Sequence, residues 1–232
     1  MTKVQIDDNF GDRTGLKKRK IMIVDDHPIT REGIARRISS EGDMMVCSEA
    51  ESAQEALQII EKQKLDLVLL DISLEASSGL DVLKDLRMRF PELHTLILSM
   101  HEESLYAERA LRAGARGYLM KREAAKKVIQ GIRAVLGGQL FVSEKITAMM
   151  AERFLEGRTA PSSPVAQLSD RELEVFQLLG RGQTTRQIAD HLHVGFKTVQ
   201  AYCARIKEKL QLANATELLR AAMQWNDNQP DK

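Results

Sequence analysis

The sequence predicts an α/β domain built on a parallel sheet, followed by a smaller all-α domain. From residue 20 to about 140, short apolar runs alternate with longer amphipathic stretches, the pattern of a parallel sheet with helices on both faces. A stretch rich in Pro, Ser and small residues, 156–167, indicates an interdomain linker. The residues after it carry closely spaced helix-start signals. A length of 232 residues fits this two-domain organisation.

Five apolar runs are expected to form the strands of the first domain. Four are nearly continuous and one is weaker: 21–24, 67–70, 96–98 and 117–120, with 44–47 as the weaker run. Apolar residues at helical spacing lie between or after them: Leu80, Leu83 and Leu86, then Val128, Ile129, Ile132, Val135 and Leu136. The pair Gly137-Gly138 is expected to end the last of these helices.

The chain divides into four predicted segments. We expect a disordered leader over 1–19, the α/β domain over 20–140, a connecting helix and linker over 141–167, and the all-α domain over 168–232. In the last segment Ser169 and Glu172 form a predicted capping box, and Thr184 and Gln187 repeat it. Four short helices are expected there, the third beginning near Phe196.

Charge and cysteine content exclude several classes of protein. Lys and Arg total 34 and Asp and Glu 33, so no global field points to nucleic acid or to a membrane. The basic excess is local, because 176–211 holds six basic residues against two acidic ones. Two distant cysteines offer neither a disulfide framework nor a zinc site. Without a signal peptide or an apolar run of about 18–20 residues, we expect a cytoplasmic protein with no membrane partner.

Polar residues follow the four strong apolar runs: Asp25 and Asp26, then Asp71, Ser99 and Lys121. Parallel strands bring these ends to one edge of the sheet, where open α/β sheets bind ligands. Carboxylates about 4 Å apart repel by about 4 kcal/mol at an effective dielectric of 20, so a cation is needed, and an all-oxygen set suits Mg²⁺ or Mn²⁺. One carboxylate can then attack a phosphoryl group, with Lys121 neutralising its oxygens and Ser99 donating to one.

These residues resemble the receiver domain of two-component response regulators. The segments are Val24-Asp25-Asp26-His27-Pro28, Leu70-Asp71-Ile72-Ser73-Leu74, Leu98-Ser99 and Gly117-Tyr118-Leu119-Met120-Lys121. The resemblance implies a flavodoxin-like, five-stranded parallel sheet. It further implies that a histidine kinase phosphorylates Asp71 and that Asp25, Asp26, Asp71 and the Ser73 carbonyl hold Mg²⁺. Ser99 and Tyr118 would form the switch pair, and Lys121 would bind the phosphoryl group.

Four positions near this site depart from the pattern or allow a second interpretation. Glu75 stands where many receivers have Pro and adds a negative charge, while Arg122 stands where many have a cis-proline. His27 is interpreted as a surface residue at the start of a loop. Tyr118, as an aromatic residue in a strand, is also a candidate core residue.

The all-α domain resembles the LuxR-type helix-turn-helix of the NarL/FixJ family. The segments that carry this resemblance are Leu168–Val175, Gln187-Ile188-Ala189, Lys197-Thr198-Val199 and Ile206–Leu210. A scaffold helix over 184–192 is expected to pack on a recognition helix over 196–210. The predicted DNA contacts are Lys197, Thr198, Gln200, Ala201, Ala204, Arg205 and Lys207. The alternative is that these residues form a solvated helical face.

Other positions of this domain leave the DNA sequence or the assembly open. Gly195 replaces the Ser usual at the start of the recognition helix, and Tyr202 stands where His is common. The last helix, which carries Leu218, Leu219 and Trp225, is interpreted either as a dimer face or as core.

Three functions remain to be compared. The leading hypothesis is a transcription regulator, homodimeric when active, whose binding to double-stranded DNA is controlled by phosphorylation of Asp71. An Asp-nucleophile phosphohydrolase is less consistent with the sequence, because such enzymes usually have an acid two residues after the nucleophile and this chain has Ser73. A docking module that ignores phosphate would not need the acidic set, Ser99 and Lys121. We therefore expect no enzymatic activity beyond the chemistry at Asp71.

Overall fold

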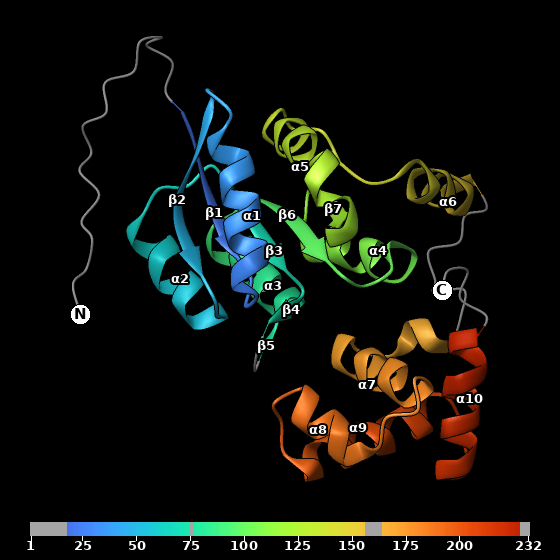
Figure 1. The fold of residues 1–232 in the computed structure, drawn as a ribbon. Helices are drawn as coiled ribbons and strands as arrows, with labels where there is room; N and C mark the ends of the chain where they lie inside the picture. The colour runs from blue at the N-terminus through green and yellow to red at the C-terminus, as the bar shows by residue number, and fades with distance from the viewer. Residues whose placement is uncertain (1–17, 75–76, 156–163, 228–232) are drawn as a thin grey trace, which may run out of the picture.

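The computed structural model describes residues 18–74, 77–155 and 164–227 and contains an α/β domain and an all-α domain (Figure 1). The first comprises β1 Arg19–Val24, α1 Pro28–Ser39, β2 Met44–Ala50, α2 Ala53–Lys62, β3 Leu67–Asp71, β4 Ser73–Leu74, β5 Ser77–Ser78, α3 Gly79–Arg89, β6 His94–Ser99, α4 Glu103–Ala113, β7 Gly117–Met120 and α5 Lys121–Leu136. Then follow α6 Glu144–Leu155, the 3₁₀ helix Pro164–Gln167, α7 Asp170–Gly180, α8 Thr185–His191, α9 Phe196–Lys209 and α10 Ala215–Asp227.

The main sheet confirms the predicted parallel architecture. Its five strands lie in the order β2-β1-β3-β6-β7, and every neighbouring pair is parallel. The chain moves outward from β1 to β2 and then returns to β3 on the other side of β1. The order of strands therefore reverses between β1 and β3, and that is where open sheets of this kind bind ligands.

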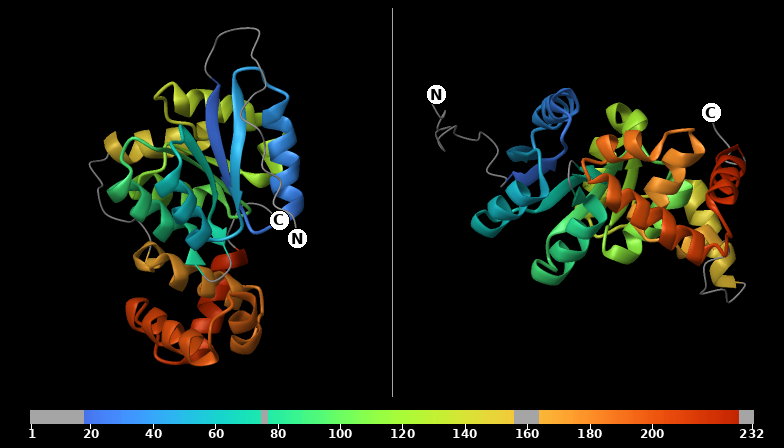
Figure 2. Two further views of the ribbon diagram at one scale, coloured as in Figure 1. Left: turned by 90° about the vertical axis from the view of Figure 1, so that its left-hand side faces the viewer. Right: turned by 90° about the horizontal axis from the view of Figure 1, so that it is seen from below.

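Alternate residues of each strand face opposite layers of helices. On β1, Ile21 and Ile23 pack in an apolar cluster with α1 and α5, whereas Met22 and Val24 belong to a cluster with α2, α3 and α4. These side chains are at most 1 % exposed, so the strand is covered on both faces. Figure 2 shows the sheet between its two helical layers. Burial on both faces explains why the strands read as continuous apolar runs.

The all-α domain begins its helices where the sequence predicts. Ser169 and Glu172 form a complete capping box at α7, and Thr184 and Gln187 form another at α8. At α10 the side chain of Asn214 accepts a hydrogen bond from the backbone N–H of Glu217 at 3.0 Å. Satisfied N-terminal N–H groups let these three capped helices, of 7 to 13 residues, begin at defined positions.

Some boundaries differ from the sequence-based expectation. Strand β1 begins at Arg19, inside the predicted leader, because its backbone N–H donates to the Asp43 carbonyl and its side chain pairs with Asp66. The hairpin of β4 and β5 was not predicted, since two-residue strands carry no periodicity. Residues 164–167 of the predicted linker form a 3₁₀ helix. Glu75, the leader up to residue 17 and linker residues 156–163 lie outside the described residues.

The predicted connecting helix forms as α6, and the two cysteines are not paired with each other. Helix α6 contains Ile146, which is completely buried, and α5 ends at Leu136, directly before the Gly pair. Cys47 and Cys203 are free and partly buried. Within the residues that the structure describes, no helix has the length and apolarity needed to cross a membrane.

Candidate functional site

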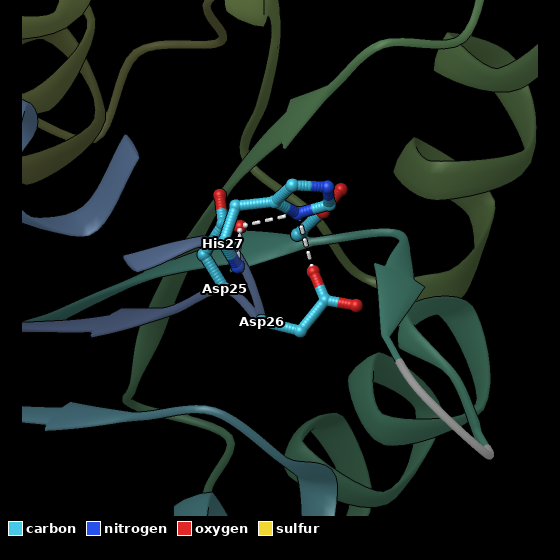
Figure 3. A group of neighbouring side chains, drawn as sticks. Asp25, Asp26 and His27 are labelled. Atoms are coloured by element: carbon cyan, nitrogen blue, oxygen red, sulfur yellow. Dashed lines mark hydrogen bonds and ion pairs between the residues drawn. The ribbon is translucent and has the colours of Figure 1, made fainter. Parts of the chain in front are cut away.

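Carboxylates from two neighbouring strands meet at the point where the strand order reverses. Asp25 follows β1 and Asp71 ends β3, and both are almost completely buried. Single ligand atoms of Asp25, Asp26, His27 and Asp71 all lie within 4.8 Å of one another. Figure 3 shows the first three of these side chains turned toward a common point. The predicted convergence of strand-end carboxylates is therefore what the fold produces.

Lys121 lies between two of these carboxylates. Its Nζ is 2.7 Å from Asp25 Oδ2 and 2.7 Å from Asp71 Oδ2, and its side chain is only 7 % exposed. Although burial disfavours its charge, the neighbouring Asp71 and Asp25 raise the pKa of Lys121. The ammonium offsets part of the repulsion between the carboxylates. The sequence placed Lys121 at this edge of the sheet but did not predict this ion pair.

The charges of the cluster leave room for a divalent cation. Asp25, Asp26 and Asp71 carry three negative charges against the single positive charge of Lys121, a difference of two. Asp25 Oδ2 and Asp26 Oδ1 are buried without a hydrogen bond of good geometry. Asp25 Oδ2 has an ion pair to Lys121, and Asp26 Oδ1 lies against Nδ1 of His27. Oxygen atoms in this state, in a mainly carboxylate set, fit a hard cation such as Mg²⁺.

Asp71 is held in one orientation by groups on both of its oxygens. The backbone N–H of Ser73 donates to Oδ1 at 3.1 Å, and Lys121 donates to Oδ2. Gly79 lets the start of α3 approach the Asp71 carbonyl so closely that a Cβ would not fit. Burial raises the pKa of Asp71 to about 6, although Lys121 acts in the opposite direction. A more basic carboxylate, still largely ionised at neutral pH, is a better nucleophile.

His27 lies beside the carboxylates while remaining exposed. Its Nδ1 is 2.5 Å from Asp26 Oδ1 and 3.2 Å from Asp25 Oδ1, and its side chain is 64 % exposed. Its backbone N–H also donates to Asp25 Oδ1 at 2.9 Å. The expectation of a surface histidine at a loop start is confirmed. The sequence did not indicate that its ring would contact the acidic cluster.

The two predicted switch residues share a contact partner, His101. Ser99 is fully buried, and its Oγ accepts a hydrogen bond from the His101 N–H at 3.0 Å. The Tyr118 hydroxyl donates to the His101 carbonyl at 2.9 Å, and its ring is 1 % exposed, so this tyrosine is also a core residue. Burial raises the pKa of Tyr118, which keeps its hydroxyl protonated.

Sequence reasoning missed His101 itself. Its Nε2 lies 2.8 Å from Ser73 Oγ, and its ring stacks on Tyr106 with centroids 4.5 Å apart. Burial, with the positive charge of Arg181 as the next cause, lowers the pKa of His101 to about 4, so the ring is neutral. Its position two residues beyond Ser99, in the loop that leaves the strand ends, is the signal that could have found it.

Helix α9 presents the predicted DNA-contacting residues on its outer surface. Val199 and Ile206 are buried and fix the helix in the domain. The candidate contacts Lys197, Thr198, Gln200, Ala201, Ala204 and Arg205 are exposed, and Lys207 is partly buried. Gly195 occupies the N-cap of α9 without a side-chain cap, as its identity implies. A helix fixed by one face and exposed by the other suits insertion into a major groove.

Lys209, one of the six basic residues in 176–211, has a structural role. Lys209, at the end of α9, lies with its Nζ 2.6 Å from Oε2 of Glu172. The Glu172 side chain is 3 % exposed and also accepts from the backbone N–H of Ser169. Although burial opposes it, the hydrogen bond with Lys209 lowers the pKa of Glu172. This pair joins α9 to the capping box of α7.

Replacing Lys209 with Met is expected to destabilise the all-α domain by about 1–2 kcal/mol, because Glu172 would keep a nearly buried charge without its cation. The loss is no larger than this because the Lys209 side chain is 38 % exposed and water screens the pair. Denaturant unfolding of the full chain measures it, with Lys197→Met, an exposed position on the same helix, as the matched control. Equal unfolding free energies for the two variants would contradict the structural role.

One face of helix α10 packs in the core of the all-α domain, and another face is exposed to solvent. Leu218 and Ala222 are buried, and Trp225 packs on Phe176 of α7 with ring centroids 5.7 Å apart. Leu219 and Met223 are 41 % and 46 % exposed. Both sequence interpretations of this helix therefore have residues to support them: a core face that is formed, and a separate apolar strip available to a second copy.

An acidic site at the edge of a doubly wound sheet, joined to a helix-turn-helix domain, is the arrangement of a class of regulatory proteins. Residues 21–133 match the response regulator receiver domain, and residues 166–222 match the bacterial regulatory proteins of the luxR family. The chain belongs to the two-component response regulators that carry a LuxR-type helix-turn-helix domain, the NarL/FixJ group.

Individual relatives agree with this assignment. The chain is 35% identical over 204 residues to the transcriptional activator protein ExaE of Pseudomonas putida, covering 88% of this chain and 95% of the relative. A two-component response regulator of the LuxR family from Aurantimonas sp. SI85-9A1 is 34% identical, with a TM-score of 0.55, over 60% of this chain and 99% of that one. Salmonella RcsB bound to the promoter P1flhDC, at 22% identity, shares the fold with a TM-score of 0.60 over 90% of this chain and 100% of its own.

Proposed function

We propose that transfer of a phosphoryl group from a histidine kinase to Asp71, with Mg²⁺ or Mn²⁺ present, controls the binding of this regulator to double-stranded DNA. The observation that carries the proposal is the setting of Asp71: a buried carboxylate held by Lys121 and the Ser73 N–H, beside two further carboxylates. The pairing of a receiver domain with a LuxR-type domain in one chain supports the same function.

The chemistry proposed at Asp71 is a phosphoryl transfer that forms an acyl phosphate. An Asp71 carboxylate oxygen forms the bond to phosphorus while the bond from phosphorus to the donor nitrogen breaks. Asp25, Asp26, Asp71 and the Ser73 carbonyl are the proposed ligands of the cation, which when bound neutralises charge on the phosphoryl oxygens. The Lys121 ammonium neutralises further charge, and the Ser99 hydroxyl donates to one phosphoryl oxygen. No acid follows Asp71 at the second position, so we propose no further hydrolase activity.

The proposed output is recognition of a major groove by α9. Lys197, Arg205 and Lys207 would contact phosphates, whereas Gln200, Ala201 and Ala204 would contact base edges, with Thr198 at the start of the helix. A homodimer using the exposed strip of α10 would place two recognition helices about one turn of DNA, or a multiple, apart. This function is exercised in the cytoplasm, where the chromosome and the kinase are both accessible.

Removing one carboxylate of the acidic cluster should weaken the binding of a divalent cation. Asp26→Asn takes one negative charge from the cluster without touching Asp71 or Lys121, so the affinity for Mn²⁺ should fall about tenfold or more. Titration of the full chain with Mn²⁺ measures the change. Asp66→Asn, far from the cluster at the start of β3, is the control and should bind Mn²⁺ as the wild type does. An unchanged affinity in Asp26→Asn would reject the ligand assignment.

The proposed function as a whole is tested by selecting duplex DNA from a random library with the full chain, with and without acetyl phosphate and Mg²⁺. The expected result is enrichment of a sequence with two half-sites, in the phosphodonor arm only or much more strongly there. Enrichment that is identical in both arms would contradict control by phosphorylation. Failure to enrich any sequence in either arm would contradict DNA recognition.

A further inference from the structure

The acidic cluster includes a nitrogen ligand atom beside its carboxylates. Asp25, Asp26, His27 and Asp71 each offer one ligand atom, and these four atoms lie within 4.8 Å of one another. Nδ1 of His27 is 2.5 Å from Asp26 Oδ1 and 3.2 Å from Asp25 Oδ1. Two ligands that bind one zinc ion at about 2.0–2.1 Å lie roughly 3 Å apart. Atoms that are already this close need only small side-chain rotations to share one cation.

The backbone around His27 holds its ring over the carboxylates. The N–H of His27 donates to Asp25 Oδ1 at 2.9 Å, and its carbonyl accepts from the N–H of Arg31 at 3.1 Å. The Arg31 side chain in turn donates to the Asp25 carbonyl at 2.6 Å, which joins the first turn of α1 to the end of β1. Dashed lines in Figure 3 join the ring to both aspartates. The fold therefore supports the imidazole in a position beside the carboxylate ligands.

A nitrogen ligand changes which cation the cluster prefers. Mg²⁺ takes oxygen ligands and usually keeps several waters, whereas imidazole is a common ligand of Zn²⁺, Ni²⁺ and Cu²⁺. A site with three carboxylates alone would favour the hard cation. Three carboxylates with His27 give one nitrogen and three oxygen ligands, which is the number that a tetrahedral zinc ion requires. The ligand set thus suits a divalent cation of the zinc class as well as Mg²⁺.

Two further observations indicate that a cation can reach and occupy this position. Asp25 is 1 % exposed, and its Oδ2, like Oδ1 of Asp26, is buried without a hydrogen bond of good geometry. A cavity of about 630 Å³ lies beside these oxygens, and its lining includes Asp26, His27 and Ser73. Because the His27 side chain is 64 % exposed, an ion from solvent meets the imidazole at the entrance to the cluster.

We propose that the acidic cluster also binds a divalent cation of the zinc class, with His27 Nδ1 as a ligand beside Asp25, Asp26 and Asp71, and that this cation inhibits phosphorylation. The inference rests on the proposed cation site and on the proposed phosphorylation of Asp71. A tetrahedral cation held by four protein ligands has no position left for a phosphoryl oxygen, and it occupies the Asp71 oxygen that would attack. Mg²⁺ exchanges bound water for phosphoryl oxygens instead. The two kinds of cation therefore compete for the same carboxylates with opposite effects.

The first test compares the affinities of the full chain for Zn²⁺, measured in competition with a chromophoric chelator, and for Mn²⁺. His27→Gln removes the nitrogen ligand, so the ratio of Zn²⁺ affinity to Mn²⁺ affinity should fall about tenfold or more. Asp26→Asn should weaken the binding of both cations, because they share the site. His94→Gln is the matched control and should keep the wild-type ratio, since β6 places His94 at the opposite edge of the sheet from Ser99. With Co²⁺ as a spectroscopic probe, the intense visible absorption of four-coordinate Co²⁺ should appear in the wild type and be lost in His27→Gln.

The second test measures labelling of Asp71 by acetyl phosphate and Mg²⁺ in the presence of Zn²⁺. Free Zn²⁺, buffered at ten times its half-saturating concentration for the wild type, should slow labelling of the wild type about tenfold and that of His27→Gln only about twofold. Equal Zn²⁺ to Mn²⁺ affinity ratios in His27→Gln and the wild type, or equal slowing of both, would overturn the inference. Mn²⁺ binding and labelling of Asp71 would then leave the proposed function intact. A wild-type chain that binds neither cation and is not labelled would reject the proposed function, and the inference with it.

Discussion

Replacing Asp71 with Asn is expected to abolish phosphorylation of the protein. Asp71 is the carboxylate that Lys121 and the Ser73 N–H hold at the end of β3, and an amide is a far weaker nucleophile toward phosphorus. With acetyl phosphate and Mg²⁺, the wild type should gain one phosphoryl group and the variant none. Intact-mass spectrometry at a series of times measures the difference.

The matched control is Asp85→Asn, which makes the same change on the exposed face of α3. This variant should be labelled at the wild-type rate. Labelling of Asp71→Asn at that rate would show that another residue accepts the phosphoryl group. In that case the geometry of the acidic site would have to be explained by metal binding alone.

Substitutions on α9 are expected to separate phosphate contacts from base contacts. Lys197→Ala should weaken binding to all DNA sequences about equally and reduce the slope of log affinity against log salt by roughly one unit. Gln200→Ala removes no charge. It should leave the slope unchanged and alter the preference between sites by about 1–3 kcal/mol per base pair. Both residues are exposed, so neither change should disturb folding.

The measurement is binding of the full chain to its selected site and to a scrambled duplex over a range of salt concentrations. Lys126→Ala, an exposed charge removed from α5 of the receiver, is the control and should keep the wild-type slope. A wild-type slope in Lys197→Ala, together with an unchanged site preference in Gln200→Ala, would mean that another face of the domain enters the groove.

The fold was largely predictable because its strongest determinants are local. Strands covered on both faces must be apolar at nearly every position, and the runs at 21–24, 67–70, 96–98 and 117–120 all became strands. A capping box likewise depends on only four consecutive residues, so the sequence correctly predicted where α7 and α8 begin. The hairpin of β4 and β5 was not predicted, because a strand of two residues is too short to show a periodic pattern of apolar residues.

The acidic site was predictable for a topological reason. Parallel strands place their carboxyl ends at one edge, so the order of residues along the chain was enough to bring Asp25, Asp71 and Lys121 together. Spacing alone did not reveal what Lys121 does, because an ion pair to two carboxylates at 2.7 Å depends on side-chain geometry. The raised pKa of Asp71 depends in the same way on burial, which no motif encodes.

By itself, the sequence determined the two domains, the parallel sheet, the acidic residues at its edge and the helix that carries the candidate DNA contacts. Only the tertiary structure decided which partners the loop after β6 would take, because His101 contacts residues 28, 17 and 5 positions away that share no pattern with it. The contact between Tyr106 and Gln177 spans 71 positions and two domains. Such a contact depends on how two separately folded surfaces fit, and a local pattern of residues carries no information about that fit.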